Sequence, residues 1–476
     1  MRLEKRIGTL LLVVMVACAV VHAQQKDPRV NPPIAPVPPL TPAESSSTVE
    51  ATPEPAAAPA KSEPRPASDI EQSGLGAWGG GRSMFTAGFR VSLHGDSNAN
   101  TSAGASRLES AATIAGNASL LRNWSTSTLS LDYSGGSTLY NTRASLNRQS
   151  HEFGLRYSLM GRAWSVTLRD SISLLPEASF GFGAGTTNIL LPGVPGQVQS
   201  QLNPLLVPNQ SIFTGTGRRI SNTLAGQVGY TLTRRSSLAI SASYGILRSV
   251  ESNLTDNHRW SVSTAYNYLL TGKDSLSLSY AHSGLGFEKT QFGISGDTVS
   301  IGYARQLTGR LSFDIGGGPH FSRFRNHVAG DGTRFSASVR SGLSYRLSDA
   351  DLDFSYTRGI TGGSGVLLGA HTDQLEGGLS KRLSRMWGAS MRLGYARNIS
   401  LVQSTGLTNQ FTFNSWYATV GFSRPIGRYT RMGLSYGITG QESNTSFCLG
   451  TSCGRSTIRH RFGLSFEFGL PPIALE

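Results

Sequence analysis

The sequence predicts an all-β fold: a transmembrane antiparallel up-and-down β-barrel of about 18 strands, with bounds of 16 and 20. Two patterns predict it. Runs of about 8 to 14 residues alternate apolar with polar side chains, and the connections between them alternate between short and long. Because a strand turns successive side chains to opposite sides, each run has one apolar and one polar face. Soluble sandwiches have shorter strands with turns every 8 to 12 residues, so the longer runs favour a barrel that is apolar outside and polar inside.

Composition separates the chain from soluble domains and from bundles of membrane helices. The 476 residues include 56 glycines, the mean hydropathy is −0.16, and charged residues make up 15%, whereas a soluble domain usually has about 25%. After the N-terminus, no stretch approaches the ~18 consecutive apolar residues of a membrane-spanning helix. A barrel does not show in this test because only half of each strand faces lipid.

The N-terminus predicts two segments ahead of the barrel. Residues 1–23 have the layout of a signal peptide, with a basic start, an apolar core and the cleavage site Val21-His22-Ala23. Lipidation at Cys18 is the alternative. Residues 24–73 are rich in Pro, Ala, Glu and Ser, and they contain too little apolar surface to fold, so we expect a disordered periplasmic tether. Residues 74–476 are assigned to the barrel.

The strands follow in order, each justified by its alternation. They are expected near 84–93, 110–121, 124–135, 144–160, 162–174, 217–233, 236–249, 258–271, 274–286, 292–306, 309–323, 333–347, 350–361, 371–383, 386–402, 411–426, 429–440 and 455–469. Short turns are expected at 122–123, 160–162, 233–235, 271–274, 308–310, 348–350, 384–385 and 425–428. The longer connections are 94–109, 136–143, 175–216, 250–257, 287–291, 324–332, 362–370, 403–410 and 441–454. Both termini then lie on the short-turn side.

The final strand carries a recognisable pattern. Phe462, Leu464, Phe466 and Phe468 share one face. This stretch resembles the last strand of bacterial outer-membrane β-barrel proteins, whose terminal aromatic is read by the barrel assembly machinery. The family pattern usually stops at that aromatic, whereas residues 469–476 follow here. The resemblance covers 84–468 in pattern, and it implies an outer-membrane location with the tether and both barrel termini in the periplasm.

Charged residues in the polar phase of the strands are expected to line the lumen. Residues 74–476 contain 36 Lys and Arg against 21 Asp and Glu. The lumen candidates are Arg90, Arg156, Arg169, Arg340, Arg346, Arg392, Arg459, Arg461, Asp132, Asp314, Asp353, Glu376 and Glu467. An excess of arginine in a narrow pore focuses a positive potential and favours anions. Arginines near turns can instead contact lipid headgroups, and paired lumen charges can be structural.

The connection at 175–216 is the longest, about forty residues rich in Gly, Pro and apolar side chains. Loops longer than about 12–15 residues are usually functional or disordered. In porins, which this arrangement resembles, the third outer loop folds into the barrel and sets the constriction. The apolar character here differs from the charged loop typical of that family. The candidates for a constriction are Phe180, Phe182, Leu190, Leu191, Leu205 and Leu206. An exposed lid or a partner-binding patch is the alternative.

Two cysteines remain after signal cleavage, Cys448 and Cys453. In an oxidising compartment this pair predicts a disulfide, and no metal site is expected because no further His or Cys has suitable spacing. No hydrolase, zincin or phosphate-loop motif occurs in a suitable context. We therefore expect no catalytic residue, no enzyme activity and no cofactor. Pairs of His and Asp near the loop side are the enzymatic alternative.

The predicted function is a channel or porin for passive diffusion of small polar solutes, with anions favoured. One alternative is an export conduit for an acidic exopolysaccharide, similar to the 18-stranded alginate channel. Another is a structural or adhesive barrel whose outer loops bind a partner. The expected partners are outer-membrane lipid, the barrel assembly machinery, the solute or acidic polysaccharide, and peptidoglycan or an envelope protein for the tether. No nucleic-acid partner is expected.

Overall fold

The computed structural model describes residues 83–99, 107–142, 146–175, 212, 218–250, 255–288, 292–325, 332–401, 411–449 and 452–475. All of them belong to the compact unit that begins at Arg65. The expected signal peptide and tether lie outside the described residues. No helix in the described part of the chain is long and apolar enough to cross a membrane.

Eighteen long strands make up the described structure. They are β1 (Ser83–Asp96), β2 (Glu109–Asn123), β3 (Ser127–Tyr140), β4 (Arg148–Met160), β5 (Trp164–Leu175), β6 (Arg219–Thr231), β7 (Ser236–Ser249), β8 (Asn257–Leu269), β9 (Asp274–Phe287), β10 (Gly293–Gln306), β11 (Leu311–Arg325), β12 (Gly332–Arg346), β13 (Ala350–Thr361), β14 (Ala370–Arg382), β15 (Gly388–Ser400), β16 (Thr412–Pro425), β17 (Thr430–Leu449) and β18 (Ser452–Gly469). A 3₁₀ turn, η4 (Gly363–Gly365), lies between β13 and β14, and a short strand, β19 (Ile473–Leu475), ends the described chain.

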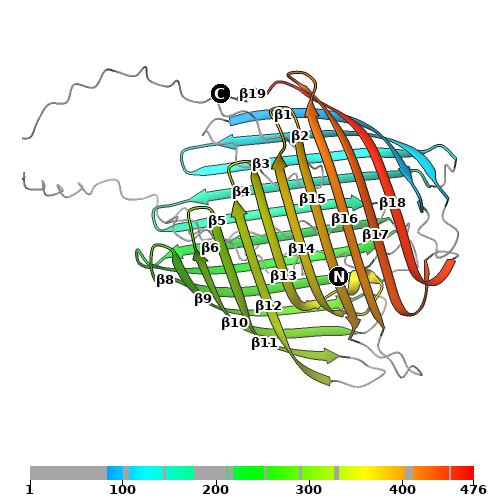
Figure 1. The fold of residues 1–476 in the computed structure, drawn as a ribbon. Coiled ribbons are helices and arrows are strands. Elements are labelled where there is room, and N and C mark those ends of the chain that lie inside the picture. Colours follow the sequence, from blue (N-terminus) through cyan, green and yellow to red (C-terminus); the bar gives the residue numbers. More distant parts are fainter. Residues whose placement is uncertain are drawn as a thin grey trace, which may run out of the picture. The chain divides into compact units, whose positions relative to one another are not determined.

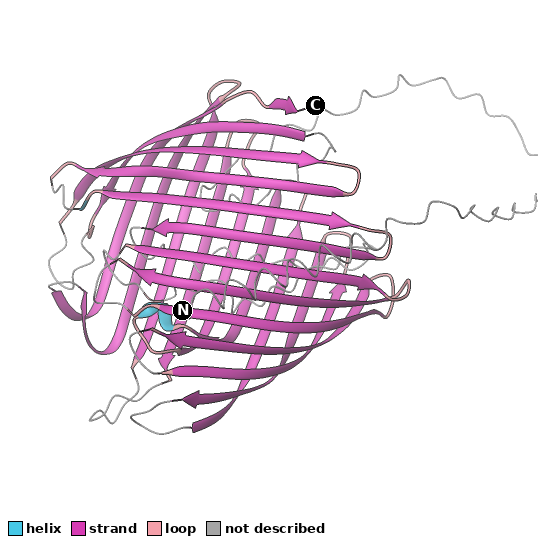
Figure 2. Cartoon of the chain, turned by 180° about the vertical axis from the view of Figure 1, so that it is seen from behind, coloured by secondary structure: helices cyan, strands magenta, loops and turns pink. Residues whose placement is uncertain are grey.

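The strands close on themselves into one barrel (Figures 1 and 2). Each long strand pairs antiparallel with its neighbours in sequence, and β1 pairs with β18 from Gly88 opposite Gly469 to Asp96 opposite Arg461. Closure leaves no unpaired sheet edge, which is the condition for a sheet to lie in hydrocarbon. The predicted all-β barrel, its antiparallel order and its count of about eighteen are confirmed.

Two predicted boundaries near the C-terminus are wrong. The expected connection at 441–454 is mostly strand, because β17 continues to Leu449 and β18 starts at Ser452. Alternation marks only the part of a strand that has lipid on one side, so a hairpin that continues into water in polar residues does not show it. Residues after Phe468, for which no strand was expected, include β19, which pairs with Ser83–Phe85 of β1.

Large apolar side chains cover the outward face of the barrel. The side chain of Leu93 is 60% exposed, Ile114 57%, Ile301 59% and Phe335 67%. Each of these residues alternates along its strand with side chains that point into the barrel. Exposed apolar surface of this extent is unfavourable in water and favourable in hydrocarbon. Outward aromatic rings reinforce the belt: a Cβ at Gly440 of β17 would lie 2.4 Å from the Trp416 ring of β16, so that glycine makes room for the ring.

Candidate functional site

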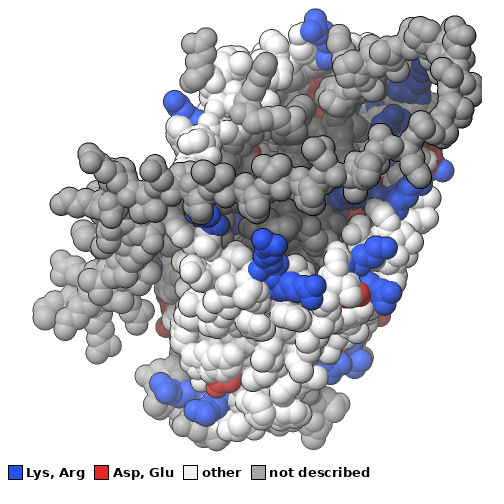
Figure 3. Space-filling view, turned by 90° about the vertical axis from the view of Figure 1, so that its left-hand side faces the viewer, with Lys and Arg blue, Asp and Glu red and all other residues white. Residues whose placement is uncertain are grey.

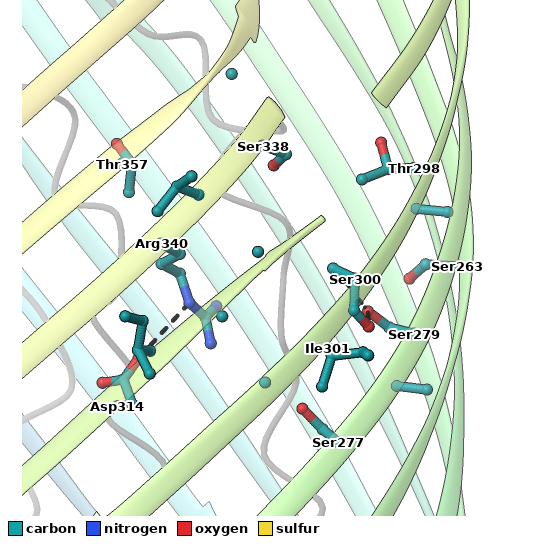
Figure 4. A pocket seen from close by; sticks show the side chains of 18 of the residues that line it. Ser263, Ser277, Ser279, Thr298, Ser300, Ile301, Asp314, Ser338, Arg340 and Thr357 are labelled. Carbon is teal, nitrogen blue, oxygen red and sulfur yellow. Dashed lines mark hydrogen bonds and ion pairs between the residues drawn. The ribbon is translucent and has the colours of Figure 1, made fainter. Parts of the chain in front are cut away.

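The lumen wall is built from the residues that alternate with the outward apolar belt. On strands β7 to β13 these inward residues are mainly Ser, Thr, Gly and Ala (Figure 4). Cross-strand hydroxyl pairs join the wall, with oxygen–oxygen distances of 2.7 Å between Ser241 and Ser263 and 2.7 Å between Ser279 and Ser300. Short hydroxyl side chains leave space inside the barrel and offer both donors and acceptors to water or a polar solute.

The structure places all thirteen predicted lumen charges on strands, in the phase opposite the exposed apolar side chains. On β1, Arg90 alternates with the outward Phe89, and on β4, Arg156 alternates with the outward Phe153 and Tyr157. On β14, Glu376 alternates with the outward Leu375. The same relation holds for the remaining candidates: Arg169, Arg340, Arg346, Arg392, Arg459, Arg461, Asp132, Asp314, Asp353 and Glu467.

Several of these charges are paired with one another. Arg90 forms an ion pair with Glu467, and Arg340 Nε lies 3.8 Å from Asp314 Oδ2 in the wall shown in Figure 4. Arg459 Nε donates to both oxygens of the fully buried Asp96, at 2.8 and 2.9 Å. These pairs connect neighbouring strands, and β1 with β18 in particular, so they stabilise the wall as well as charge it.

Arg156 and Arg169 are arranged differently. They are direct cross-strand partners on β4 and β5, both inward, and no carboxylate among the described residues forms an ion pair with either. Like charges directly opposite each other are unfavourable. Their neighbour Asp132 accepts hydrogen bonds from Ser119 and Ser130, at 2.6 and 2.9 Å. The two guanidinium groups therefore form a concentrated positive patch on one wall.

The opposite wall carries both acids and arginines. Strands β13 and β14 lie half-way round the ring of eighteen from β4 and β5. Their inward residues include Asp353 and Glu376, which are diagonal neighbours, since Asp353 is opposite Gly378 and Ser355 is opposite Glu376. Arg392 of β15 lies opposite Gly378, beside both acids, so this wall carries charges of both signs.

Sequence reasoning missed other inward charged residues, among them Asp96, Glu109, Arg219, Arg259 and Arg431. The three arginines alternate with outward residues on their own strands, so the period of two would have found them. Asp96 and Glu109 fell in the expected connection 94–109 but lie at the ends of β1 and β2, where they are direct cross-strand partners. No local pattern marks a strand end.

Apolar side chains gather inside the mouth at the long-connection end. One cluster comprises Leu285, Phe287, Phe292, Ile294, Ile360 and Leu401. The segment between β13 and β14 packs against it: a Cβ at Gly369, which has a φ of 81°, would be 2.7 Å from Ile294 Cδ1. Only glycine combines this left-handed backbone with so close an approach.

Ile212 connects the longest connection to this mouth. It is fully buried against Leu367, Ala370 and Phe413, and its N–H donates to Ser364 Oγ at 3.3 Å. These contacts belong to strands and turns on the far side of the barrel from β5 and β6, between which Ile212 lies in sequence. The constriction candidates Phe180, Phe182, Leu190, Leu191, Leu205 and Leu206 lie outside the described residues.

The remaining predicted sites have these positions. The backbone register makes Cys448 and Cys453 opposite residues of β17 and β18, a placement suited to the predicted disulfide. His282 Nδ1 lies 2.7 Å from Asp297 Oδ1 on the outward wall, with Tyr280 also donating to Asp297. Within the described ranges, no group of three His, Cys, Asp or Glu residues is placed to hold a metal ion.

Lys and Arg also gather at the end of the barrel that faces the viewer in Figure 3. The short turns supply them through Arg162, Arg234, Arg235, Lys273, Arg310, Arg385 and Arg428. Arg424 and Arg428 lie over the rings of Trp387 and Tyr429, at 5.6 and 5.4 Å from the ring centres. Cations stacked on aromatic rings at a barrel rim are placed where headgroups meet water.

Comparisons with known proteins give a weak likeness to solved structures. No family model matches the chain, and no curated protein matches it. The matching structures include OccK2 (OpdF) of Pseudomonas aeruginosa, at 11% identity and a TM-score of 0.42, covering 82% of this chain and 98% of that one. OpdK of the same organism, solved with vanillate, has 12% identity and a TM-score of 0.41, with coverage of 82% and 99%. OccAB3 of Acinetobacter baumannii has 9% identity and a TM-score of 0.41, with coverage of 82% and 99%.

Similarity at this level carries no argument about the solute, so the assignment depends on the chain's own geometry. Eighteen antiparallel strands close without an edge, large apolar side chains cover the outside, and hydroxyl and charged side chains line the inside. A closed sheet with this distribution is stable only with hydrocarbon around it and water within. The described residues form a closed antiparallel β-barrel of the membrane-spanning type, with eighteen long strands.

Proposed function

We propose that this barrel is a passive channel for small polar solutes, with a preference for those that carry an anionic group. The observation that carries the proposal is the pair of inward guanidinium groups, Arg156 and Arg169, that no described carboxylate neutralises. A carboxylate or phosphate passing this wall replaces water as their partner, since guanidinium groups bind both in a fixed geometry.

The route begins at the apolar mouth and continues along the hydroxyl wall. Ile212, Leu367 and Phe413 narrow the mouth, which supports a constriction formed by the 175–216 connection. An apolar rim lowers the cost of shedding water for the carbon skeleton of an organic solute. The long connections face the cell exterior in this proposal, and the short turns, the tether and both barrel termini face the periplasm.

Conductance in planar lipid bilayers tests the function directly. The purified full-length protein should produce stepwise openings, and in a KCl gradient the reversal potential should have the sign of a chloride-preferring pore, because the lumen carries more Arg than acid. Cation selectivity would contradict the anion preference. A barrel that never conducts would contradict the channel itself and would leave a structural or adhesive role.

A further inference from the structure

A continuous polar row crosses the outward face of β13 to β17, the strands on the near side of Figure 1. Direct cross-strand pairing places its members side by side: Arg358, Asp373, Arg397, Asn414 and Glu442. Each belongs to the lipid-facing phase of its strand, the phase that also contains Phe354, Leu375 and Leu393. A row of charges on the side of a barrel that faces lipid requires a partner at that level.

The row lies immediately beyond the outer aromatic belt. Tyr356, Leu375, Tyr395 and Trp416 are the corresponding residues two positions nearer the short turns. Tyr356 donates its hydroxyl hydrogen to Asp373 at 2.9 Å, and Tyr395 donates to Asn414 at 3.2 Å. Tyrosine rings anchor where hydrocarbon gives way to polar headgroups. The row is therefore at headgroup level, with apolar wall beneath it.

The row has more positive than negative charge on its first three strands. Arg358 Nη1 lies 3.4 Å from Asp373 Oδ1, so this carboxylate already has a cation and a tyrosine as partners. Arg397 is exposed, and no described residue accepts a hydrogen bond from its guanidinium group. The Tyr395 hydroxyl donates a hydrogen bond to the amide oxygen of Asn414. The amide N–H₂ group of Asn414 can therefore donate hydrogen bonds to another acceptor. Arg397 and Asn414 together present unused donors to the headgroup layer.

The spacing suits one phosphate. Neighbouring strands are about 4.8 Å apart, so the Cα atoms of Arg358 and Arg397, two strands apart, are separated by roughly 10 Å. Both arginine side chains are long enough to converge on an anion above Asp373. Arginine binds phosphate through two parallel N–H groups, and this geometry is strongest at a partly dehydrated site such as a membrane boundary.

We infer that the outward row Arg358–Asp373–Arg397–Asn414 binds a phosphate group of the glycolipid of the outer leaflet. The phosphate lies between Arg397 and Arg358 and accepts from Asn414, while the acyl chains lie on the apolar wall formed by Phe354, Leu375 and Leu393. The choice of the outer leaflet rests on the proposed orientation, in which the long connections face outward. The phosphate chemistry itself follows from the row alone.

Native mass spectrometry of the full-length barrel, exchanged into detergent with bisphosphorylated lipid A, tests the site. Wild-type protein should retain lipid A, whereas the double variant Arg358→Gln/Arg397→Gln should retain roughly tenfold less, because the charged hydrogen bonds are lost. Arg424→Gln is the matched control: it removes an outward arginine of the neighbouring β16 at the short-turn rim and should retain as much lipid as wild type. Arg397→Gln alone covers the case in which the double variant does not fold.

Two further probes separate the sources of phosphate. Lipid A without phosphates should bind wild type no better than it binds the double variant. Phosphatidylglycerol should bind more weakly than bisphosphorylated lipid A, and a reverse order would overturn the assignment to outer-leaflet glycolipid. Equal retention of lipid A by wild type and both row variants would overturn the site. Bilayer conductance of the double variant should equal that of wild type, so the channel proposal and this one fail independently.

Discussion

Arg156 and Arg169 show how a single cross-strand position sets the character of the lumen. Two like charges directly opposite each other on a sheet destabilise the strand pair relative to a neutral pair. The unfavourable term is smallest when water or an anion occupies the space between them. An arginine with a structural role is usually paired with a carboxylate, as Arg90 is paired with Glu467. The Arg156–Arg169 pair lacks such a partner, so it is better suited to binding a transient anionic ligand.

The double substitution Arg156→Gln/Arg169→Gln tests this interpretation. Removing both charges should lower the permeability ratio of chloride to potassium by roughly threefold, because the local positive potential is lost. It should leave stability unchanged or raise it slightly, because the repulsion is lost as well. Reversal potentials in a KCl gradient measure the first effect, and thermal unfolding in detergent measures the second.

Arg122→Gln is the control for that experiment. Arg122 is on the outward face of β2, 5.4 Å from the ring centre of Trp124, and does not face the lumen. Its substitution should leave ion selectivity as it is in wild type. An equal change in both variants would mean that selectivity follows total charge, and the role given to the cross-strand pair would be wrong.

Strand β19 gives the barrel seam an additional length of pairing. Strand β18 pairs with residues Gly88 to Asp96 of β1. Strand β19 pairs with the first residues of β1, Ser83 to Phe85. The backbone N–H of Leu470 donates to Ala87 O at 2.8 Å between the two paired regions. The residues after Phe468 thus extend the closure of the barrel to the start of its first strand.

Deletion of residues 470–476 should weaken the seam without preventing closure, because the pairing of β1 with β18 remains. A loss of about 1–3 kcal/mol is expected from the few hydrogen bonds removed. On gels, the folded band of the deletion variant should disappear at a lower temperature than the folded band of the wild-type protein. Replacing Pro471 and Pro472 with Ser, which keeps the length, should change it less. An unchanged temperature for the deletion would show that β19 adds nothing to closure.

The turn between β13 and β14 positions the mouth at the scale of one connection. Three residues there have positive φ: 65° at Gly363, 56° at Ser364 and 81° at Gly369. This compact backbone packs Leu367 and Ala370 against Ile212 and Phe413. Contacts of this kind pack the mouth with apolar side chains, whereas the inward residues Arg156 and Arg169 lie deeper on the strands.

Orientation is a property of the whole barrel and can be tested with two glycines. Gly272 is in a short turn and Gly332 begins β12 at the long-connection end, and a Cβ at either would meet no atom within 4 Å. Either glycine can therefore be replaced by Cys without steric conflict. In cells that carry Cys448→Ser and Cys453→Ser, a membrane-impermeant maleimide should label Gly332→Cys while the cells are intact. It should label Gly272→Cys only after the outer membrane is opened, and the reverse pattern would contradict the proposed orientation.

Much of the fold could be predicted from the sequence because the relevant signal is local. Alternation of side chains is decided by the backbone of each strand, so the phase of Arg156, Glu376 or Glu467 could be read without knowing any neighbour. The order of short and long connections likewise gave the count of strands. The extended hairpin of β17 and β18 was missed because its mostly polar residues show no apolar alternation. The strand β19 was missed because three residues are too few to show a period.

The sequence by itself therefore determined that this chain is a barrel with an apolar outside and an arginine-rich inside. Only the tertiary structure decided which charges meet. Arg156 opposite Arg169 depends on the register of one strand pair, the acids facing them depend on closure of the whole ring, and Ile212 reaches Phe413 across the mouth. These contacts join residues far apart in sequence, and the physical reason that no local pattern encodes them is that ring closure, a global condition, brings them together.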